Sequence, residues 1–181
     1  MKRWIKLVKI AKAFCSKDIT RPHLQRPYCR DNRIYATDGH RMIVIKSELP
    51  QGAVEIVDNN FIAIVTDTLS PFPNCSGIKT ELDMCERYEF TVPLWFATLK
   101  NKEIITMKIG PSFFDARLFA PMAGEKIVCW VSAKDIKGPM TFCFENTDTP
   151  YDDALAYGVI MPILEHDHVD INLKCVLQSN W

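Results

Sequence analysis

The spacing of apolar and polar positions predicts an amphipathic α-helix at the start of the chain. At about 100° per residue, one face of this helix gathers Trp4, Leu7, Val8, Ala11, Phe14 and Cys15. The roughly opposite face carries Lys2, Lys6, Lys9 and Lys12. We expect Asp18, Thr20 and Pro22 to end the helix, because the residue before a proline is pushed out of helical geometry.

Short apolar runs separated by turn residues predict strands along the rest of the chain. In the first half they cover residues 23–29 weakly, 33–37, 41–47, 54–57 and 61–66, with turns at Asp31-Asn32, Asp38-Gly39 and 58–60. In the second half they cover 88–92, 104–109, 113–119, 126–131, 140–145 and 154–163, and PLWFATLKNK (93–102) favours a short helix. Two prolines and a glycine in LSPFPNCSG, residues 69–77, indicate a subdomain junction. A helix followed by several strands therefore occurs twice, which predicts an α+β architecture with helices on one face of antiparallel sheets.

Composition narrows the class of protein without naming a partner. The 181 residues suit one domain or two small, closely packed ones, and 48% hydrophobic with 24% charged residues describes a folded globule. The 22 basic and 22 acidic side chains cancel, so a nucleic-acid surface would have to be a local basic patch. No apolar stretch is long enough to span a bilayer, so we expect a cytoplasmic protein without membrane contact. The seven cysteines lack a CxxC pair, and we expect reduced thiols that are mostly buried.

The stretch IYATDGHRMIVIK, residues 34–46, has two interpretations. Asp38, Gly39, His40 and Arg41 place an acid, a base and a cation side by side, as in a catalytic cluster. Catalysis would also need a nucleophile or second base, and the chain has no nucleophile elbow or glycine-rich phosphate loop. An Asp-Gly dipeptide between two strands is typical of a hairpin turn, because glycine tolerates positive φ and aspartate bonds neighbouring amides. The local chemistry favours the turn.

Two further groups of residues have a functional and a plain interpretation. In LEHDHVD, residues 164–170, His166 and His168 could bind a metal beside Glu165, Asp167 or Asp170, with Asp152 and Asp153 as distant carboxylates; a solvated linker is the simpler interpretation. The lysines of the first helix form either a solvated face or, together with Arg21, Arg26 and Arg30, a surface that neutralises phosphates without reading bases.

Two stretches resemble the bacterial DNA polymerase III beta sliding clamp. IAKAFCSKDITRPHLQRPYCRDNRIYATDGHRMIVIKS, residues 10–47, is similar to the clamp's middle domain, carries its ATDGHR signature and is the more specific of the two matches. KGPMTFCFENTDTPYDDALAYGVIMPI, residues 137–163, resembles the end of the last clamp domain, and SPFPN (70–74) is similar to a junction that follows a clamp domain. The resemblance implies a ring around duplex DNA that tethers polymerases and repair proteins and catalyses nothing. It also implies that each domain consists of two helix-plus-strands halves.

The resemblance also implies roles for individual residues. Lys2, Lys6, Lys9, Lys12 and Arg21 would face DNA. A pocket for short linear peptides of client proteins would have two walls, one formed by Thr37, Gly39, His40, Arg41 and Met42 and the other by Val159, Met161, Pro162 and Ile163. Glycine would let a ligand backbone approach, and methionine would adapt to varied apolar anchors.

The chain departs from the clamp pattern in its length. A clamp subunit has three such domains, and this chain has length for little more than one, so a ring would need about six copies, as a homo-oligomer, or a partner chain. The reduced form suggests a phage or another mobile element as its source. We expect one DNA-clamp-like domain over residues 1–163, with halves at about 1–70 and 86–163, and a C-terminal extension over 164–181.

The resemblance therefore implies a non-enzymatic platform for processivity or recruitment. Its expected partners are double-stranded DNA, bound without sequence preference, and DNA polymerase or other clients bound through short linear motifs. We expect no cofactor and no metal. The alternatives are a clamp mimic that uses the pocket without encircling DNA, and a metal-dependent hydrolase that uses His166 and His168.

Overall fold

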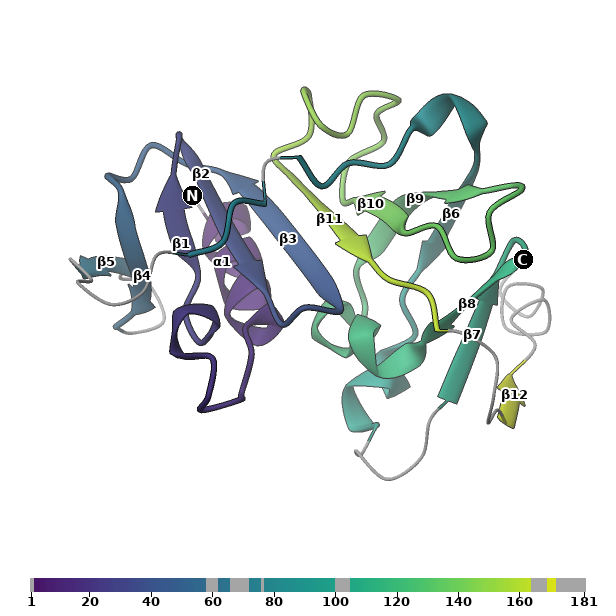
Figure 1. Cartoon of the computed structure of the whole chain (residues 1–181), viewed down its shortest axis with the longest axis horizontal. Helices are drawn as coiled ribbons and strands as arrows, with labels where there is room; N and C mark the ends of the chain where they lie inside the picture. Colours follow the sequence, from purple (N-terminus) through teal and green to yellow (C-terminus); the bar gives the residue numbers. More distant parts are fainter. Residues whose placement is uncertain are drawn as a thin grey trace. The chain divides into compact units, whose positions relative to one another are not determined.

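The computed structural model describes residues 2–57, 62–65, 72–75, 77–99, 105–163 and 169–171 (Figure 1). The chain forms two compact units. Unit 1 comprises Met1–Ile78 together with Leu155–Gly158, and unit 2 comprises Lys79–Ala154 together with Val159–Trp181. Each unit is therefore assembled from two separate stretches of the chain.

Unit 1 consists of one α-helix and an antiparallel sheet. Its elements are α1 (Lys2–Phe14), a 3-10 helix at Pro22–Leu24, β1 (Tyr28–Arg30), β2 (Arg33–Thr37), β3 (Arg41–Lys46), β4 (Gly52–Ile56) and β5 (Ile62–Val65). The strands lie in the order β5-β4-β1-β2-β3, and the part of β11 (Ala156–Ile160) that belongs to this unit follows β3. Lys46 N donates to Leu155 O at 2.9 Å at the start of this returning segment.

The core of unit 1 lies between α1 and strands β2 and β3. The helix buries Leu7, Val8, Ile10, Ala11 and Phe14. In the sheet, Ile34 is paired with Ile45, Ala36 is paired with Ile43, and all four side chains are buried. Because burying an aliphatic side chain of this size contributes roughly 1.5–3 kcal/mol, this contact is the main reason why the lysine-rich helix stays on the sheet.

Unit 2 contains a three-stranded segment of antiparallel sheet and a second small sheet. Its elements are a 3-10 helix at Leu82–Met84, β6 (Cys85–Thr91), 3-10 helices at Leu94–Thr98 and Ala116–Met122, β7 (Ile105–Ile109), β8 (Ser112–Asp115), β9 (Lys126–Ser132), β10 (Met140–Cys143) and β12 (Val169–Ile171). The first strands lie in the order β10-β9-β6 and the second sheet in the order β12-β7-β8. Strand β12 pairs in parallel with β7, a pairing that the sequence analysis did not predict.

Aromatic rings form the core of unit 2. Phe119 is buried, and its ring centroid lies 6.5 Å from Phe90, 6.5 Å from Phe96 and 6.4 Å from Phe114. Tilted and edge-on arrangements at these distances are favourable for aromatic pairs. The two 3-10 helices contribute Phe96 and Phe119, so they pack on the strands through large side chains rather than through a long helical face.

The α+β prediction is confirmed, and the predicted strand 33–37 coincides with β2. Two local predictions are wrong. Residues 23–29 were expected as a strand, but Pro22–Leu24 form a 3-10 helix and the strand begins only after Pro27. The expected strand 113–119 stops at Asp115, because the Asp115 carboxylate accepts a hydrogen bond from Arg117 N at 2.9 Å and so starts a 3-10 helix. The short helix expected within 93–102 is confirmed, because Leu94–Thr98 form a short 3-10 helix directly after Pro93.

No helix in the described part of the chain combines the length and the apolar character needed to cross a membrane.

Candidate functional site

The turn between β2 and β3 is closed by its own side chains. Thr37 Oγ1 donates to Arg41 O at 2.7 Å and accepts from Gly39 N at 3.0 Å. Asp38 Oδ1 accepts from His40 N at 2.9 Å and from Arg41 N at 3.1 Å. Gly39 adopts a φ of 96°, a conformation that side chains of L-residues rarely adopt. The Asp38 carboxylate therefore builds the hairpin, in agreement with the turn interpretation of the tetrad.

Arg41 joins this turn to the end of α1. Its Nε lies 2.9 Å from Asp38 Oδ2, and its Nη2 donates to Ala13 O at 2.8 Å. The guanidinium carbon also lies 4.6 Å from the centroid of the Phe14 ring. The last carbonyls of a helix have no partner within the helix, so Arg41 satisfies one of them. The Arg41 side chain is only 12% exposed, and it stabilises unit 1 whatever else it binds.

The residues predicted for the first peptide-binding wall differ in exposure. Thr37 and Met42 are buried, whereas Gly39 and His40 are exposed. Of this wall, the backbone at Gly39 and the His40 ring are therefore what unit 1 presents to solvent, and Met42 lines the interior.

The second predicted wall lies in unit 2. Val159 is buried, Met161 is 42% exposed, and Pro162 and Ile163 are half-buried. Ile163 N donates to Phe113 O at 2.9 Å, which fixes this segment to β8. The two walls belong to different units, and a joint pocket stays a prediction.

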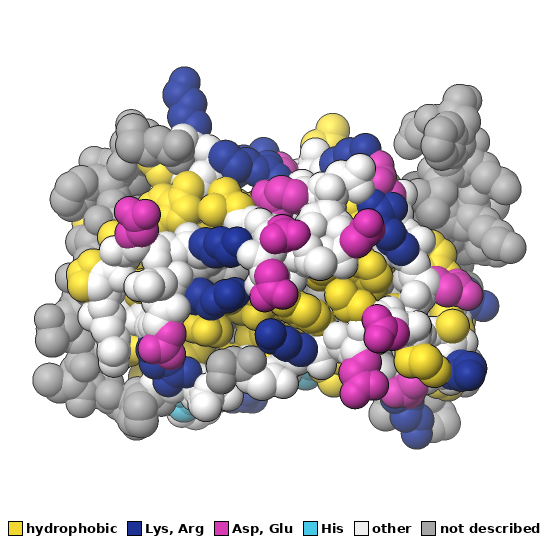
Figure 2. Space-filling model, turned by 90° about the horizontal axis from the view of Figure 1, so that it is seen from above, with side chains coloured by type: hydrophobic (Ala, Val, Ile, Leu, Met, Phe, Trp, Pro, Cys, Tyr) yellow, Lys and Arg dark blue, Asp and Glu magenta, His cyan; other side chains and the backbone are white. Residues whose placement is uncertain are grey.

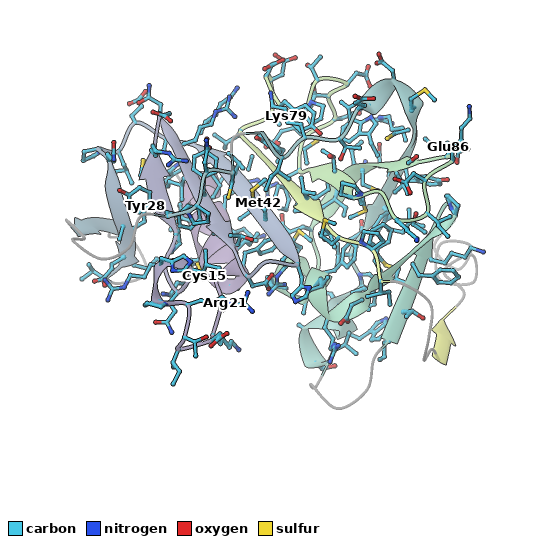
Figure 3. The ribbon with its side chains drawn as sticks, in the orientation of Figure 1. Cys15, Arg21, Tyr28, Met42, Lys79 and Glu86 are labelled. Carbon is cyan, nitrogen blue, oxygen red and sulfur yellow. The ribbon has the colours of Figure 1, made fainter. Side chains whose placement is uncertain are left out.

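The cations predicted to face DNA lie on the exposed side of α1 and in the loop that follows. Lys2, Lys6, Lys9 and Lys12 are all exposed. Lys12 Nζ also donates to Gln25 O at 3.0 Å, so it ties the helix to the loop. Arg21, which is labelled in Figure 3, has Nε 3.2 Å from Asp18 Oδ2 and a half-exposed side chain. Its Nη1 lies 3.3 Å from the point that a Cβ on Gly39 would occupy, which brings the loop to the β2–β3 turn.

A surface hollow in unit 1 was missed by sequence reasoning. It has a volume of about 520 Å³ and is lined by Trp4, Asp31, Asn32, Arg33, Lys46, Ser47 and Glu48. Trp4 Nε1 donates to Lys46 O at 3.0 Å, which fixes the indole at its edge. The residues come from the start of α1, the β1–β2 turn and the end of β3, and no motif in the sequence links them.

The described cysteines are free, and five of these six are buried. Burial raises the pKa of the Cys15 thiol to about 12 and that of Cys143 to about 11. Burial also raises the pKa of Cys129. A thiol with such a pKa is almost entirely protonated at neutral pH and is a poor nucleophile. These cysteines therefore act as small core residues.

The proposed metal ligands His166 and His168 lie outside the described residues. Within the part of the chain that the structure describes, no cluster of three or more His, Cys, Asp or Glu side chains could hold a metal ion.

The described elements form an α+β protein. No known family profile matches the sequence, and no curated protein matches it. Among solved structures, the chain is similar to the sliding clamp (DNA polymerase III subunit beta) of Bartonella birtlesii bound to griselimycin, at 14% identity and a TM-score of 0.59 over 90% of this chain and 64% of that one. It is also similar to the beta subunit of Thermotoga maritima, at 12% identity and a TM-score of 0.58 over 91% of this chain and 64% of that one. It is likewise similar to the beta chain of Streptococcus pneumoniae, at 13% identity and a TM-score of 0.57 over 91% of this chain and 63% of that one.

These matches establish the clamp-like fold. The chain spans less than two thirds of the length of the clamp subunits that it matches.

Proposed function

We propose that this protein is a sliding-clamp-like, DNA-associated protein without catalytic activity, which serves as a platform for processivity or recruitment. The clamp-like fold carries this proposal, because it is shared with sliding clamps over nine tenths of the chain. The hairpin chemistry of the tetrad supports it, since Asp38 accepts hydrogen bonds from its own turn and from Arg41.

Duplex DNA is the proposed partner of the exposed side of α1. The helix contains no acidic residue, and Lys2, Lys6 and Lys9 are exposed on it. Lysines at this spacing can neutralise backbone phosphates without reading bases, so the binding would be independent of sequence and sensitive to salt. On the side shown in Figure 2, Lys and Arg side chains are interspersed with Asp and Glu, so this face is not uniformly basic.

The DNA contact is tested with Lys6→Ala combined with Lys9→Ala. We expect this double variant to lose retention on DNA and to show a smaller dependence of affinity on salt concentration. Lys134→Ala with Lys137→Ala is the matched control, because both side chains are exposed and belong to unit 2 rather than to α1. Equal DNA retention by the two double variants would favour a clamp mimic that never encircles DNA.

Ring formation needs further chain length. Because the chain spans only 62–64% of the clamp subunits that it matches, we propose that additional copies or a partner chain complete a ring. The mass in solution, measured with and without DNA, tests this. A ring is retained on circular duplex and slides off a linear one of the same sequence. A protein that stays monomeric and binds neither duplex would exclude a ring.

The recruitment role is proposed to use His40 and the segment from Val159 to Ile163. Both His40 and Met161 are exposed, so their replacement leaves the cores of the two units intact. We expect His40→Ala with Met161→Ala to abolish binding of a clamp-binding peptide from a bacterial DNA polymerase. Ile136→Ala is the control, since Ile136 is an exposed apolar residue elsewhere in unit 2. Unchanged peptide affinity in the double variant would show that the pocket lies elsewhere.

A further inference from the structure

The loop that follows α1 presents an apolar side chain to solvent. Ile19 is 85% exposed, the highest value among the exposed large hydrophobic residues of the described chain. An isolated exposed isoleucine in a flexible loop would need no explanation. The surroundings of Ile19 differ from that case in two respects, the order of the loop and the charges beside it.

The loop is held in one conformation by Asp18. Its Oδ1 accepts from Thr20 N at 2.9 Å and from Thr20 Oγ1 at 2.7 Å, and its Oδ2 lies 3.2 Å from Arg21 Nε. The Asp18 carbonyl accepts from Arg21 N at 3.1 Å and from Gln25 Nε2 at 3.1 Å. These bonds hold the loop on both sides of Ile19, so the isoleucine is presented by an ordered backbone.

Cations lie on both sides of this apolar tip. Lys17 is exposed on one side, and the Arg21 side chain is 50% exposed on the other. The loop continues from the end of α1, the helix that carries the exposed lysines, and in Figure 1 it projects beyond that end of the helix. Asp18 lies between Lys17 and Ile19, but its carboxylate is bonded to Thr20 and paired with Arg21, so the two cations leave the loop with a net positive charge. An apolar side chain on such a loop matches a surface that carries negative charge and offers apolar area at its base.

We propose that Ile19 is a wedge that contacts the bases of duplex DNA in the minor groove while Lys17 and Arg21 hold the flanking phosphates. Apolar wedges between base steps use aliphatic side chains such as Ile, Leu and Met, and the cost of unstacking is a few kcal/mol per step. Unstacking costs least at a mismatched step. The ligand class is therefore duplex DNA that contains a weakened base step, at which the protein pauses. This inference rests on the proposed DNA association.

The experiment compares an intact duplex with the same duplex carrying one mismatch, both measured by fluorescence anisotropy with the full chain. We expect the wild-type protein to bind the mismatched duplex about fivefold more tightly, which corresponds to partial burial of one aliphatic side chain. Ile19→Ala should remove this preference and leave the affinity for the intact duplex and the salt dependence unchanged, because an apolar contact releases no counterions. Ile19→Leu should retain the preference.

Lys17→Ala is the matched control for the charges. It should weaken binding to both duplexes equally and reduce the salt dependence by about one counterion. Circular dichroism of each variant verifies that the loop change leaves the fold intact.

The outcomes separate this inference from the proposed function. Wild-type protein that binds both duplexes equally, or an Ile19→Ala variant that keeps the preference, would overturn the wedge and leave DNA association standing. Wild-type protein that binds neither duplex would overturn both. Ile19-dependent binding to vesicles of phosphatidylglycerol, with no effect of Ile19→Ala on DNA binding, would assign the tip to a lipid surface and overturn the wedge.

Discussion

Arg41 and Ala13 stand 28 positions apart in the chain, and the Arg41 side chain donates from Nη2 to the Ala13 carbonyl at 2.8 Å. The same guanidinium pairs with Asp38 and lies over the Phe14 ring. A residue of the turn between β2 and β3 is thus also the group that closes the end of α1. Its effect on stability must be measured before its effect on binding is interpreted.

We expect Arg41→Ala to lower the free energy of unfolding by about 2 kcal/mol, because a charge-assisted hydrogen bond and a cation–π contact are lost together. Denaturant-induced unfolding measures this change, provided that the slope of the unfolding free energy against denaturant concentration is the same for both proteins. Arg41→Lys keeps the charge but lacks the planar fork, so it should recover less than half of the loss. Full stability of Arg41→Ala would mean that the carbonyl of Ala13 finds another partner.

Gly39 is constrained by its own backbone and by Arg21. A φ of 96° strains any other residue, and a Cβ would lie 3.3 Å from Arg21 Nη1. We expect Gly39→Ala to cost about 1–2 kcal/mol of stability, with most of the loss persisting in an Arg21→Ala background. A double-mutant cycle with Gly39→Ala and Arg21→Ala separates the backbone strain at residue 39 from the steric contact with Arg21. Complete rescue by Arg21→Ala would place the whole cost in the steric contact instead.

Much of the candidate site follows from the sequence, because its chemistry is local. The Asp-Gly pair forces a turn between two apolar runs, and a helix with apolar positions three and four apart must bury that face. The bond from Arg41 to Ala13 could not be predicted, since it depends on how α1 lies on β3. The end of the predicted strand 113–119 at Asp115 was also missed, because one carboxylate capping Arg117 N outweighs the β-propensity of the residues that follow. The hollow beside Trp4 combines three distant segments, and no spacing rule connects them.

Because most of the described thiols are buried, we expect them to react slowly with a thiol reagent while the protein is folded. With a pKa of about 12, Cys15 holds roughly one ten-thousandth of its thiol as thiolate at about pH 8. We expect Cys15, Cys129 and Cys143 to react with a thiol reagent only on unfolding, and the half-exposed Cys85 to react first. Peptide mapping after timed labelling distinguishes these sites, with Cys175→Ser protein as the background. Rapid labelling of Cys15 would contradict its burial.

The same pKa values predict an alkaline loss of stability. Unfolded thiols ionise at their ordinary pKa of 9.0, whereas folded Cys15 ionises only near a pKa of 12 and Cys143 near a pKa of 11. The thiols therefore hold their protons more tightly in the folded state. Their contribution to the free energy of unfolding is complete below about pH 9 and decreases as the pH rises towards these values. Denaturant midpoints measured on both sides of pH 9 test this. Cys15→Ala protein should show a shallower decline, and an identical decline would place its origin in other groups.

Tyr151 holds the first residues of unit 2 in place. Its hydroxyl accepts from Thr80 N at 2.6 Å, donates to Thr80 O at 3.0 Å and lies 2.9 Å from Thr141 Oγ1. We expect Tyr151→Phe to destabilise the protein by about 1–3 kcal/mol, since polar groups that are partly buried lose their partner. Hydrogen exchange should locate the change at the Thr80 amide. Thr149→Ala, in the same loop but outside this network, is the control, and equal protection of the Thr80 amide in wild type and Tyr151→Phe would exclude the network as its cause.

Unit 1 requires residues from two separate stretches of the chain, because Leu155–Gly158 return to it after most of unit 2 has been traversed. During synthesis on the ribosome, α1 and β1 to β3 therefore emerge long before the segment that bonds Lys46 through Leu155. The nascent chain must carry an incomplete sheet edge at β3 until residue 158 leaves the exit tunnel. Folding of unit 1 is consequently tied to the synthesis of residues 155–158 rather than to the release of its N-terminal half.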